Sequence, residues 1–318
     1  MRGLTLGGSV PIGLNRWFMA DVSAPTPPTT PTAPAQAAPT TPSAGGSIGD
    51  LDITTEQTSL TSARSMSPLT DALRDASGAA GLGYLVALVD VNTAMVGLCA
   101  SSPDWTATSD LMLHESAPLV HGPTILESHL TRAGSRLVVV SVDIYDGDGL
   151  TDMDELTDPL DLARVATGLV TFARVPASTS TAAATWDPRS TVGVRRHLER
   201  PGDLPAEPLL ERIGLQVVDA SRGVVELGNS PYVQNSRGRI NGGVLGMVFQ
   251  GAAEAIVPDH VGSDLHIHYL ASARVGPVRT DTVVVREADG HVVCRVQALD
   301  AGADDLLVAQ ATVTLQRY

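Results

Sequence analysis

The sequence predicts an α+β fold that is built twice along the chain, each time as an antiparallel sheet wrapped around one central buried helix. Three observations support it: an internal repeat, two segments that are apolar on nearly all sides, and runs of strand-type residues after each of them. The chain has 318 residues, 43% hydrophobic and 3% aromatic. About two domains are therefore expected, with cores of aliphatic side chains.

The internal repeat sets the architecture. Residues 110–146 align without a gap with residues 264–300, and 11 of these 37 positions are identical. The identities include a Gly-Pro pair, at 122–123 in the first copy and 276–277 in the second. Self-similarity of this kind indicates a tandem duplication.

Each copy of the repeat has one helix followed by strands. Residues 81–100 and 243–256 are apolar nearly all round, which is typical of a buried helix. Alternating or β-branched runs separated by turn signals such as DGDG and EADG predict the strands. These runs cover residues 110–116, 123–132, 136–145 and 166–175, then 264–272, 277–287, 290–300 and 306–316.

Composition divides the chain into four parts. Residues 1–46 form a tail rich in Pro, Thr and Ala, which is expected to be disordered because it contains too few core-forming residues. Residues 47–176 form the first predicted domain and residues 206–318 the second. Residues 177–205 are polar and contain Pro, and are expected to be a linker.

Charge and composition exclude several classes of protein. A net charge of −14 argues against a non-specific nucleic-acid binder, which would present a basic face. No run of 18 apolar residues occurs, so no membrane span is expected. The two cysteines, Cys99 and Cys294, lie in apolar stretches and cannot form a disulfide framework, which favours a cytoplasmic location.

A glycine-containing motif precedes each predicted helix. It reads N-x-x-G-x-x-N-G-G at residues 235–243 and D-x-x-G-x-x-G-L-G at residues 75–83. Together with a buried helix and an antiparallel sheet, it resembles the hotdog fold, and more narrowly the phenylacetate-pathway type of acyl-CoA thioesterase. That family has N-x-x-G-x-x-H-G-G, with an Asp or Glu seven residues after the second Gly. The resemblance covers about residues 50–176 and 206–318 and implies a thioester hydrolase of lipid metabolism.

The two copies depart from the family motif in opposite ways. The second copy has Asn241 in place of the His and Gln250 at the position of the acid. The first copy keeps the acid, as Asp90, but its upstream motif differs from the family motif at several positions. In dimeric members of the family, one subunit supplies helix-start amides and the other the acid. If the copies pack as an intramolecular pseudo-dimer, Asp90 would face Asn235, Gly242 and Gly243.

The resemblance assigns roles to these residues. Asp90 would be the general base or nucleophile, because a buried carboxylate has a raised pKa. The amides of Gly242 and Gly243 would stabilise the oxyanion at the positive end of a helix dipole. Asn235 would belong to the same site, with a role as a turn or cap residue as its alternative. Thr108, two residues before the Asp that begins the next strand, would hold the attacking water. The opposite site, with Gln250 against the amides of Leu82 and Gly83, would lack an ionisable group.

Three arginines, Arg132, Arg136 and Arg286, flank predicted turns and are candidates for binding the phosphates of CoA. A plain surface role is an equal alternative for them. CoA would enter as part of the substrate, and no separate cofactor is expected.

Two histidines raise the question of a metal site. His266 and His268 alternate along a predicted strand and so share a face, and His114 repeats His268 in the first copy. No third ligand has the spacing of a zinc site. A structural role, with no bound metal, is therefore the expectation.

Acyl-CoA hydrolysis is the leading interpretation of the sequence, and two alternatives remain. A hotdog hydratase needs an Asp/His pair near the helix start, but no His occurs at residues 50–113 or 198–259. A non-catalytic protein that binds acyl-CoA or acts as a scaffold would fit the departures from the motif. The acyl chain, the pathway and any homo-oligomer beyond the pseudo-dimer stay open.

Overall fold

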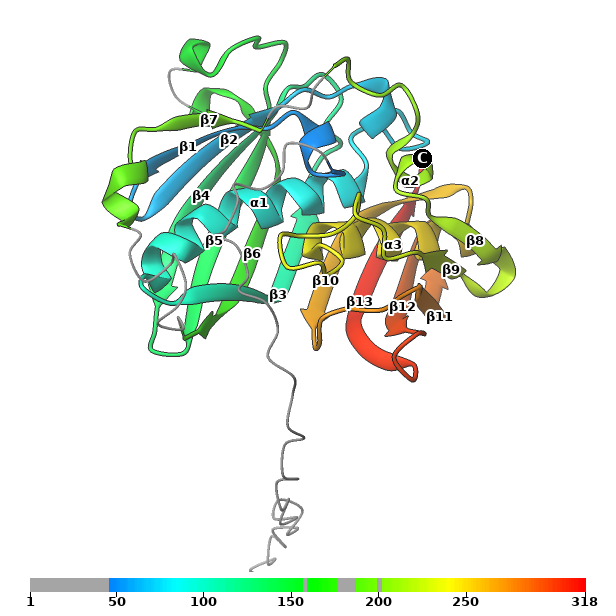
Figure 1. Ribbon diagram of the computed structural model, residues 1–318. Coiled ribbons are helices and arrows are strands. Elements are labelled where there is room, and N and C mark those ends of the chain that lie inside the picture. Colours follow the sequence, from blue (N-terminus) through cyan, green and yellow to red (C-terminus); the bar gives the residue numbers. More distant parts are fainter. Residues whose placement is uncertain (1–45, 157–158, 177–186, 199–201) are drawn as a thin grey trace, which may run out of the picture. The chain divides into compact units, whose positions relative to one another are not determined.

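The computed structural model describes residues 46–156, 159–176, 187–198 and 202–318, all of which lie in one compact unit. Apart from Gly46, the predicted disordered tail lies outside the described residues. The described strands form one 13-stranded antiparallel sheet in the order β7-β1-β2-β4-β5-β6-β3-β10-β13-β12-β11-β9-β8 (Figure 1). The α+β class and the antiparallel sheet predicted from the sequence are confirmed.

The first half of the sheet is built around one long helix. Its elements are η1 Gly49–Leu51, β1 Thr54–Ser59, β2 Ser62–Ser67, η2 Asp71–Leu73, α1 Leu82–Ser101, β3 Trp105–Glu115, β4 Thr124–Ala133, β5 Leu137–Asp146, η3 Met153–Glu155, η4 Pro159–Asp161 and β6 Ala163–Val175. Helix α1 contacts all of the strands β1–β6.

The second half repeats this order of elements. Its elements are α2 Leu209–Arg212, β8 Gln216–Asp219, η7 Ala220–Arg222, β9 Val224–Leu227, α3 Gly242–Ile256, β10 His260–Tyr269, β11 Val278–Ala288, β12 His291–Asp300 and β13 Leu306–Arg317. Strands β2-β4-β5-β6-β3 in one half correspond to β9-β11-β12-β13-β10 in the other. Strands β3 and β10 pair with each other and join the halves, with Asp110 opposite His268 and His114 opposite Asp264.

Both predicted helices and all eight predicted strands are present, with ends shifted by a few residues. The strands before each helix were missed. Strands β1 and β2 consist mainly of Ser, Thr and other polar residues, so they carry little of the apolar alternation that reveals a strand. Two further elements, η6 Pro188–Thr191 and β7 Arg195–His197, lie inside the predicted linker, and β7 extends the sheet beside β1.

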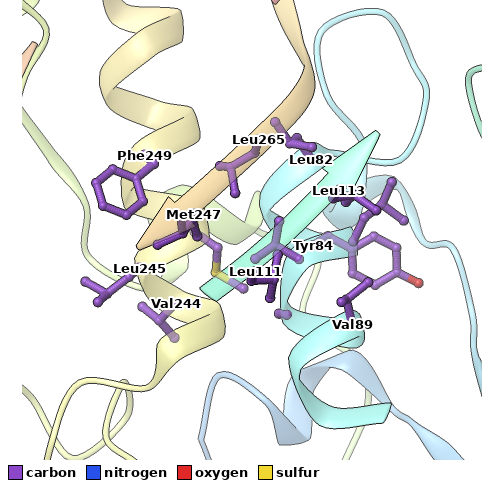
Figure 2. Packing of buried hydrophobic residues seen from close by; sticks show 14 of the residues in the cluster. Leu82, Tyr84, Val89, Leu111, Leu113, Val244, Leu245, Met247, Phe249 and Leu265 are labelled. Atoms are coloured by element: carbon purple, nitrogen blue, oxygen red, sulfur yellow. The ribbon is translucent and has the colours of Figure 1, made fainter. Parts of the chain in front are cut away.

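Helices α1 and α3 pack against each other at glycines. A Cβ atom on Gly243 would lie 2.7 Å from the Cα of Ala87, and one on Gly83 would lie 2.7 Å from the Cα of Met247. Since real side chains do not tolerate such contacts, glycine at these positions is what lets the helix backbones approach. Figure 2 shows apolar side chains of both helices meeting those of β3 and β10.

Judged by length and composition alone, helix α1 is long and apolar enough to cross a membrane. In the folded chain, however, 72% of its most apolar stretch is buried. It lies between the strands of the first half and α3, so its apolar character is that of a core helix.

The first described residues bind to the second half. The amide of Ser47 donates to the carbonyl oxygen of Tyr232 at 2.8 Å. Asp50 lies 3.2 Å from the guanidinium of Arg212 in a buried ion pair, and accepts a hydrogen bond from the hydroxyl of Tyr232. This N-terminal segment therefore ties the two halves together.

Candidate active site

Asp90 lies on α1, in contact with the strand that follows the helix. The hydroxyl of Thr108 on β3 donates to Oδ1 of Asp90 at 2.9 Å. A bulge in the β3–β6 pairing falls between Thr108 and Asp110. Because a bulge shifts the alternation of side chains, Thr108 faces the helix while Asp110 faces the other side of the sheet.

The carboxylate of Asp90 also faces the beginning of α3 in the second half. A Cβ atom on Gly242 would lie 3.3 Å from Oδ2 of Asp90 and 3.5 Å from the ring of Tyr269. The amide of Gly243 donates to Oδ1 of Asn241, the N-cap residue, at 2.8 Å, and the same amide acts to lower the pKa of Asp90. The structure thus brings together Asp90, Thr108, Gly242 and Gly243 from both halves.

Burial raises the pKa of Asp90 above its ordinary value, although bonds from Thr108 and the Gly243 amide act in the opposite direction. The hydroxyl of Tyr269 donates to the carbonyl oxygen of Gly242 at 3.0 Å. Burial, together with the charges of Asp90 and Asp110, raises the pKa of Tyr269 well above its ordinary value. Tyr269 therefore stays a neutral donor that fixes the first turn of α3.

The structure places Asn235 in the loop before α3 rather than against Asp90. Its Oδ1 accepts from the amides of Arg237, at 2.9 Å, and Arg239, at 3.3 Å. Its own amide donates to the carbonyl oxygen of Arg239 at 2.7 Å. These bonds shape the turn that leads into the helix. Sequence reasoning treated Asn241 only as a departure from the family motif, although a residue that can cap a helix directly before the apolar run was a readable signal. It missed Tyr269.

The equivalent position in the second half is occupied by Gln250. Its Oε1 accepts from the amide of Gly83 at 2.7 Å, as the sequence predicted for the opposite site. Its Nε2 donates to Oε1 of Glu254 at 2.9 Å, and the amide of Gly262 donates to the same oxygen at 3.1 Å. The expectation that this site lacks an ionisable group is therefore wrong. Glu254 lies one helical turn after Gln250, at a position that the family motif does not include.

Burial raises the pKa of Glu254 to about 7, partly offset by the bonds from Gln250 and Gly262. A cavity of about 240 Å³ opens here. Its lining includes Leu73, Arg74, Asp75, Tyr84, Leu209, Gln250 and Glu254. A carboxamide at position 250 can donate a hydrogen bond to Glu254, whereas a carboxylate there would repel the Glu254 carboxylate.

The three predicted CoA-binding arginines are exposed and lie around hairpins: Arg132 and Arg136 at β4–β5, and Arg286 at β11–β12. Among the described residues, no hydrogen bond or ion pair connects them to Asp90. Another cation lies closer to the helix start. The guanidinium of Arg237 sits 5.5 Å from the ring centre of Trp105, the first residue of β3. This pair joins the loop before α3 to the strand that carries Thr108.

Residues 231–316 match the family model of the acyl-CoA thioesterase N-terminal domain. No curated protein matches the chain.

Three solved structures share the fold. A 12:0-ACP thioesterase from Umbellularia californica is 10% identical, covering 81% of this chain and 94% of its own, with a TM-score of 0.54. A protein assigned as a thioesterase II from Thermobifida fusca is 16% identical, covering 86% and 98%, with a TM-score of 0.51. An acyl-ACP thioesterase from Bacteroides thetaiotaomicron is 9% identical, covering 80% and 98%, with a TM-score of 0.50. In its fold, and in the sequence of residues 231–316, the chain is similar to acyl thioesterases.

Proposed function

We propose that the chain hydrolyses acyl thioesters, with an acyl-CoA as substrate, at a site to which both halves contribute. One observation carries the proposal: the Asp90 carboxylate of the first half faces Gly242 and Gly243, at the N-terminus of α3 in the second half. Thioester hydrolysis needs a base beside a set of amide donors. The match of residues 231–316 to a thioesterase family model supports the same reaction.

The chemistry follows from this arrangement. The thioester carbonyl oxygen binds at the start of α3, where the backbone amides and the helix dipole stabilise developing negative charge. Asp90, with Thr108 orienting the water, removes a proton as the water oxygen attacks the carbonyl carbon. The tetrahedral intermediate then collapses, the C–S bond breaks, and the proton passes to the thiolate. The products are a carboxylic acid and a free thiol.

Asp90 could instead attack the carbonyl itself and form an anhydride. A single turnover in H₂¹⁸O distinguishes the two routes. Direct attack by water places the label in the acid product alone, whereas an anhydride that water opens at the Asp90 carbonyl places the label in the Asp90 carboxylate.

We infer that the two halves are tandem hotdog copies, residues 47–176 and 206–318, arranged as an intramolecular pseudo-dimer. The matching strand orders of the two halves support this inference. The phenylacetate-pathway type, the cytoplasmic location and the lack of a separate cofactor stay predictions.

A second function is favoured at the opposite position: binding of an acyl thioester without hydrolysis. The cavity beside Gln250 and Glu254 supports it. There the amide of Gly83 is already occupied by Gln250, and the Leu82 side chain packs 2.6 Å from where a Cβ on Gly262 would lie. Position 250 carries a carboxamide where the equivalent position of the first half carries the Asp90 carboxylate, so binding without hydrolysis is favoured there.

The test is the variant Asp90→Asn, assayed for thiol release from a panel of acyl-CoAs. The amide keeps the shape of the side chain and its bond to Thr108, but it is not a base. Turnover should fall by about 10²–10⁴-fold, with circular dichroism and melting temperature showing a folded protein. Near-normal turnover would show that Asp90 is not the base. Binding of a non-hydrolysable analogue with no turnover in the wild type would favour the non-catalytic function.

A further inference from the structure

Three side chains from the two halves converge on the outer face of the sheet, where β3 pairs with β10. Oδ2 of Asp110 lies 2.9 Å from Nε2 of His266 and 2.8 Å from Nδ1 of His268. The two imidazole ring centres are 4.3 Å apart. His266 and His268 are two residues apart on one strand, and Asp110 sits directly opposite His268 on the other.

The pseudo-symmetric position provides an internal comparison. There His114 lies 2.8 Å from Asp264, and this pair corresponds to His268 and Asp110 in the repeat. The residue that corresponds to His266 is Met112. One histidine–aspartate pair at each position therefore follows from the duplication and joins the strands. His266 is the added group, and only it makes one of the two positions a cluster of three.

We propose that Asp110, His266 and His268 form a binding site for a divalent transition-metal ion. Imidazole nitrogens and a carboxylate oxygen are the ligands that zinc takes, and three such protein ligands leave one coordination position open. The sequence pointed away from a metal because its third ligand was sought along the chain. The third ligand is instead supplied across the sheet by a residue of the other half.

The three candidate ligand atoms already lie within 4.8 Å of one another. Zinc lies about 2.0–2.1 Å from nitrogen and oxygen ligands, so ligand atoms in a tetrahedral site are about 3.3 Å apart. The present separations of 2.8 and 2.9 Å must widen by a few tenths of an ångström. The side chains are partly exposed: His266 by 38%, His268 by 49% and Asp110 by 30%. They can therefore move apart, and solvent can supply the remaining ligand.

A metal here would cross-link the two halves where the sheet is continuous between them. Its ligands would be close in sequence to residues of the candidate active site, but the ion would lie on the other face of the sheet. Thr108 precedes Asp110 by two residues, and Tyr269 follows His268 directly. The ion would hold in place the strands that position these two side chains.

The proposal is tested on the full chain after treatment with a chelator. Isothermal titration with Zn²⁺ should show one site per chain, and Mg²⁺, which prefers oxygen ligands, should show none. Co²⁺ should give the visible absorption bands of a site with nitrogen ligands. Zn²⁺ should also raise the melting temperature of the wild type, because an ion that binds only the folded state stabilises it.

Matched variants locate the site. His266→Met copies the residue of the pseudo-symmetric position and should weaken Zn²⁺ binding at least about tenfold. His114→Met changes the other position and should leave binding unaltered. Asp110→Asn provides a second change in the proposed site, and circular dichroism checks that each variant is folded. The proposal is overturned if the wild type binds no Zn²⁺, if His266→Met binds it as tightly as the wild type, or if His114→Met loses it equally.

Discussion

Replacing Glu254 with Gln should make the stability of the protein less sensitive to pH. Burial raises the pKa of Glu254 from 4.5 to about 7. Between these two values the folded protein keeps a proton that the unfolded chain releases. The contribution of this group to stability is therefore full at pH below about 4.5 and is lost as pH rises through about 7.

The size of the effect follows from the shift. A difference of about 2.5 pKa units corresponds to about 3 kcal/mol, at 1.36 kcal/mol per unit. A Gln at 254 keeps an oxygen that can accept from Gln250 and from the Gly262 amide, so both contacts survive in the uncharged variant. Between pH 4.5 and pH 8, the wild type should lose up to about 3 kcal/mol of stability through Glu254. The Glu254→Gln variant should not show this loss.

Urea unfolding of wild type and variant at several pH values between 4.5 and 8 measures this difference. Glu287→Gln, which removes an exposed carboxylate on β11, is the matched control and should show no such trend. A stability difference between wild type and Glu254→Gln that stays constant from pH 4.5 to pH 8 would refute the reasoning.

Three further predictions concern the candidate site and the chain around it. Gly242→Val should reduce thiol release about as much as Asp90→Asn, because its Cβ alone would lie 3.3 Å from the Asp90 carboxylate. The matched variant Leu82→Val should reduce thiol release little. Equal losses in both variants would contradict the assignment of one competent site. Removing residues 1–45 should leave the melting temperature unchanged. Extending the deletion through residue 53 removes the fully buried Leu51 and Ile53 and should cost about 3–6 kcal/mol of stability; a large loss from the shorter deletion would show that the tail contributes to the fold. Arg237→Ala should raise KM for an acyl-CoA with little change in kcat, because it removes a cation in the loop that leads into α3. Arg132→Ala, on a hairpin away from that loop, should not, and the reverse ranking would favour the arginines predicted from the sequence.

The repeated residues show how sequence and structure divide the explanation. Asp146 accepts the amides of Val120, His121 and Gly122, and Asp300 accepts those of the equivalent residues Arg274, Val275 and Gly276. Gly122 and Gly276 have φ angles of 72° and 76°, a conformation that glycine adopts without strain. The alignment therefore detected two copies of a turn held by a buried aspartate. Several of its identities are structural rather than catalytic.

The sequence alone predicted the helices and most of the strands that the structure shows, and from it came the hypotheses of a duplication and of the acid and glycines of the candidate site. These features are local, since hydrophobic periodicity and short motifs lie within a few residues of one another. Sequence also located Asp90 and Gln250 on equivalent helices. It could not identify Asp110 as a neighbour of His266, because this contact depends on the register of β3 against β10. Glu254 lies four residues after Gln250 on α3, so their contact is local, but the burial that raises the pKa of Glu254 depends on tertiary packing. Contacts between residues more than 150 positions apart form only when folding brings the two halves together. Tertiary structure therefore decided which polar groups meet, and with them the environments that set their chemistry.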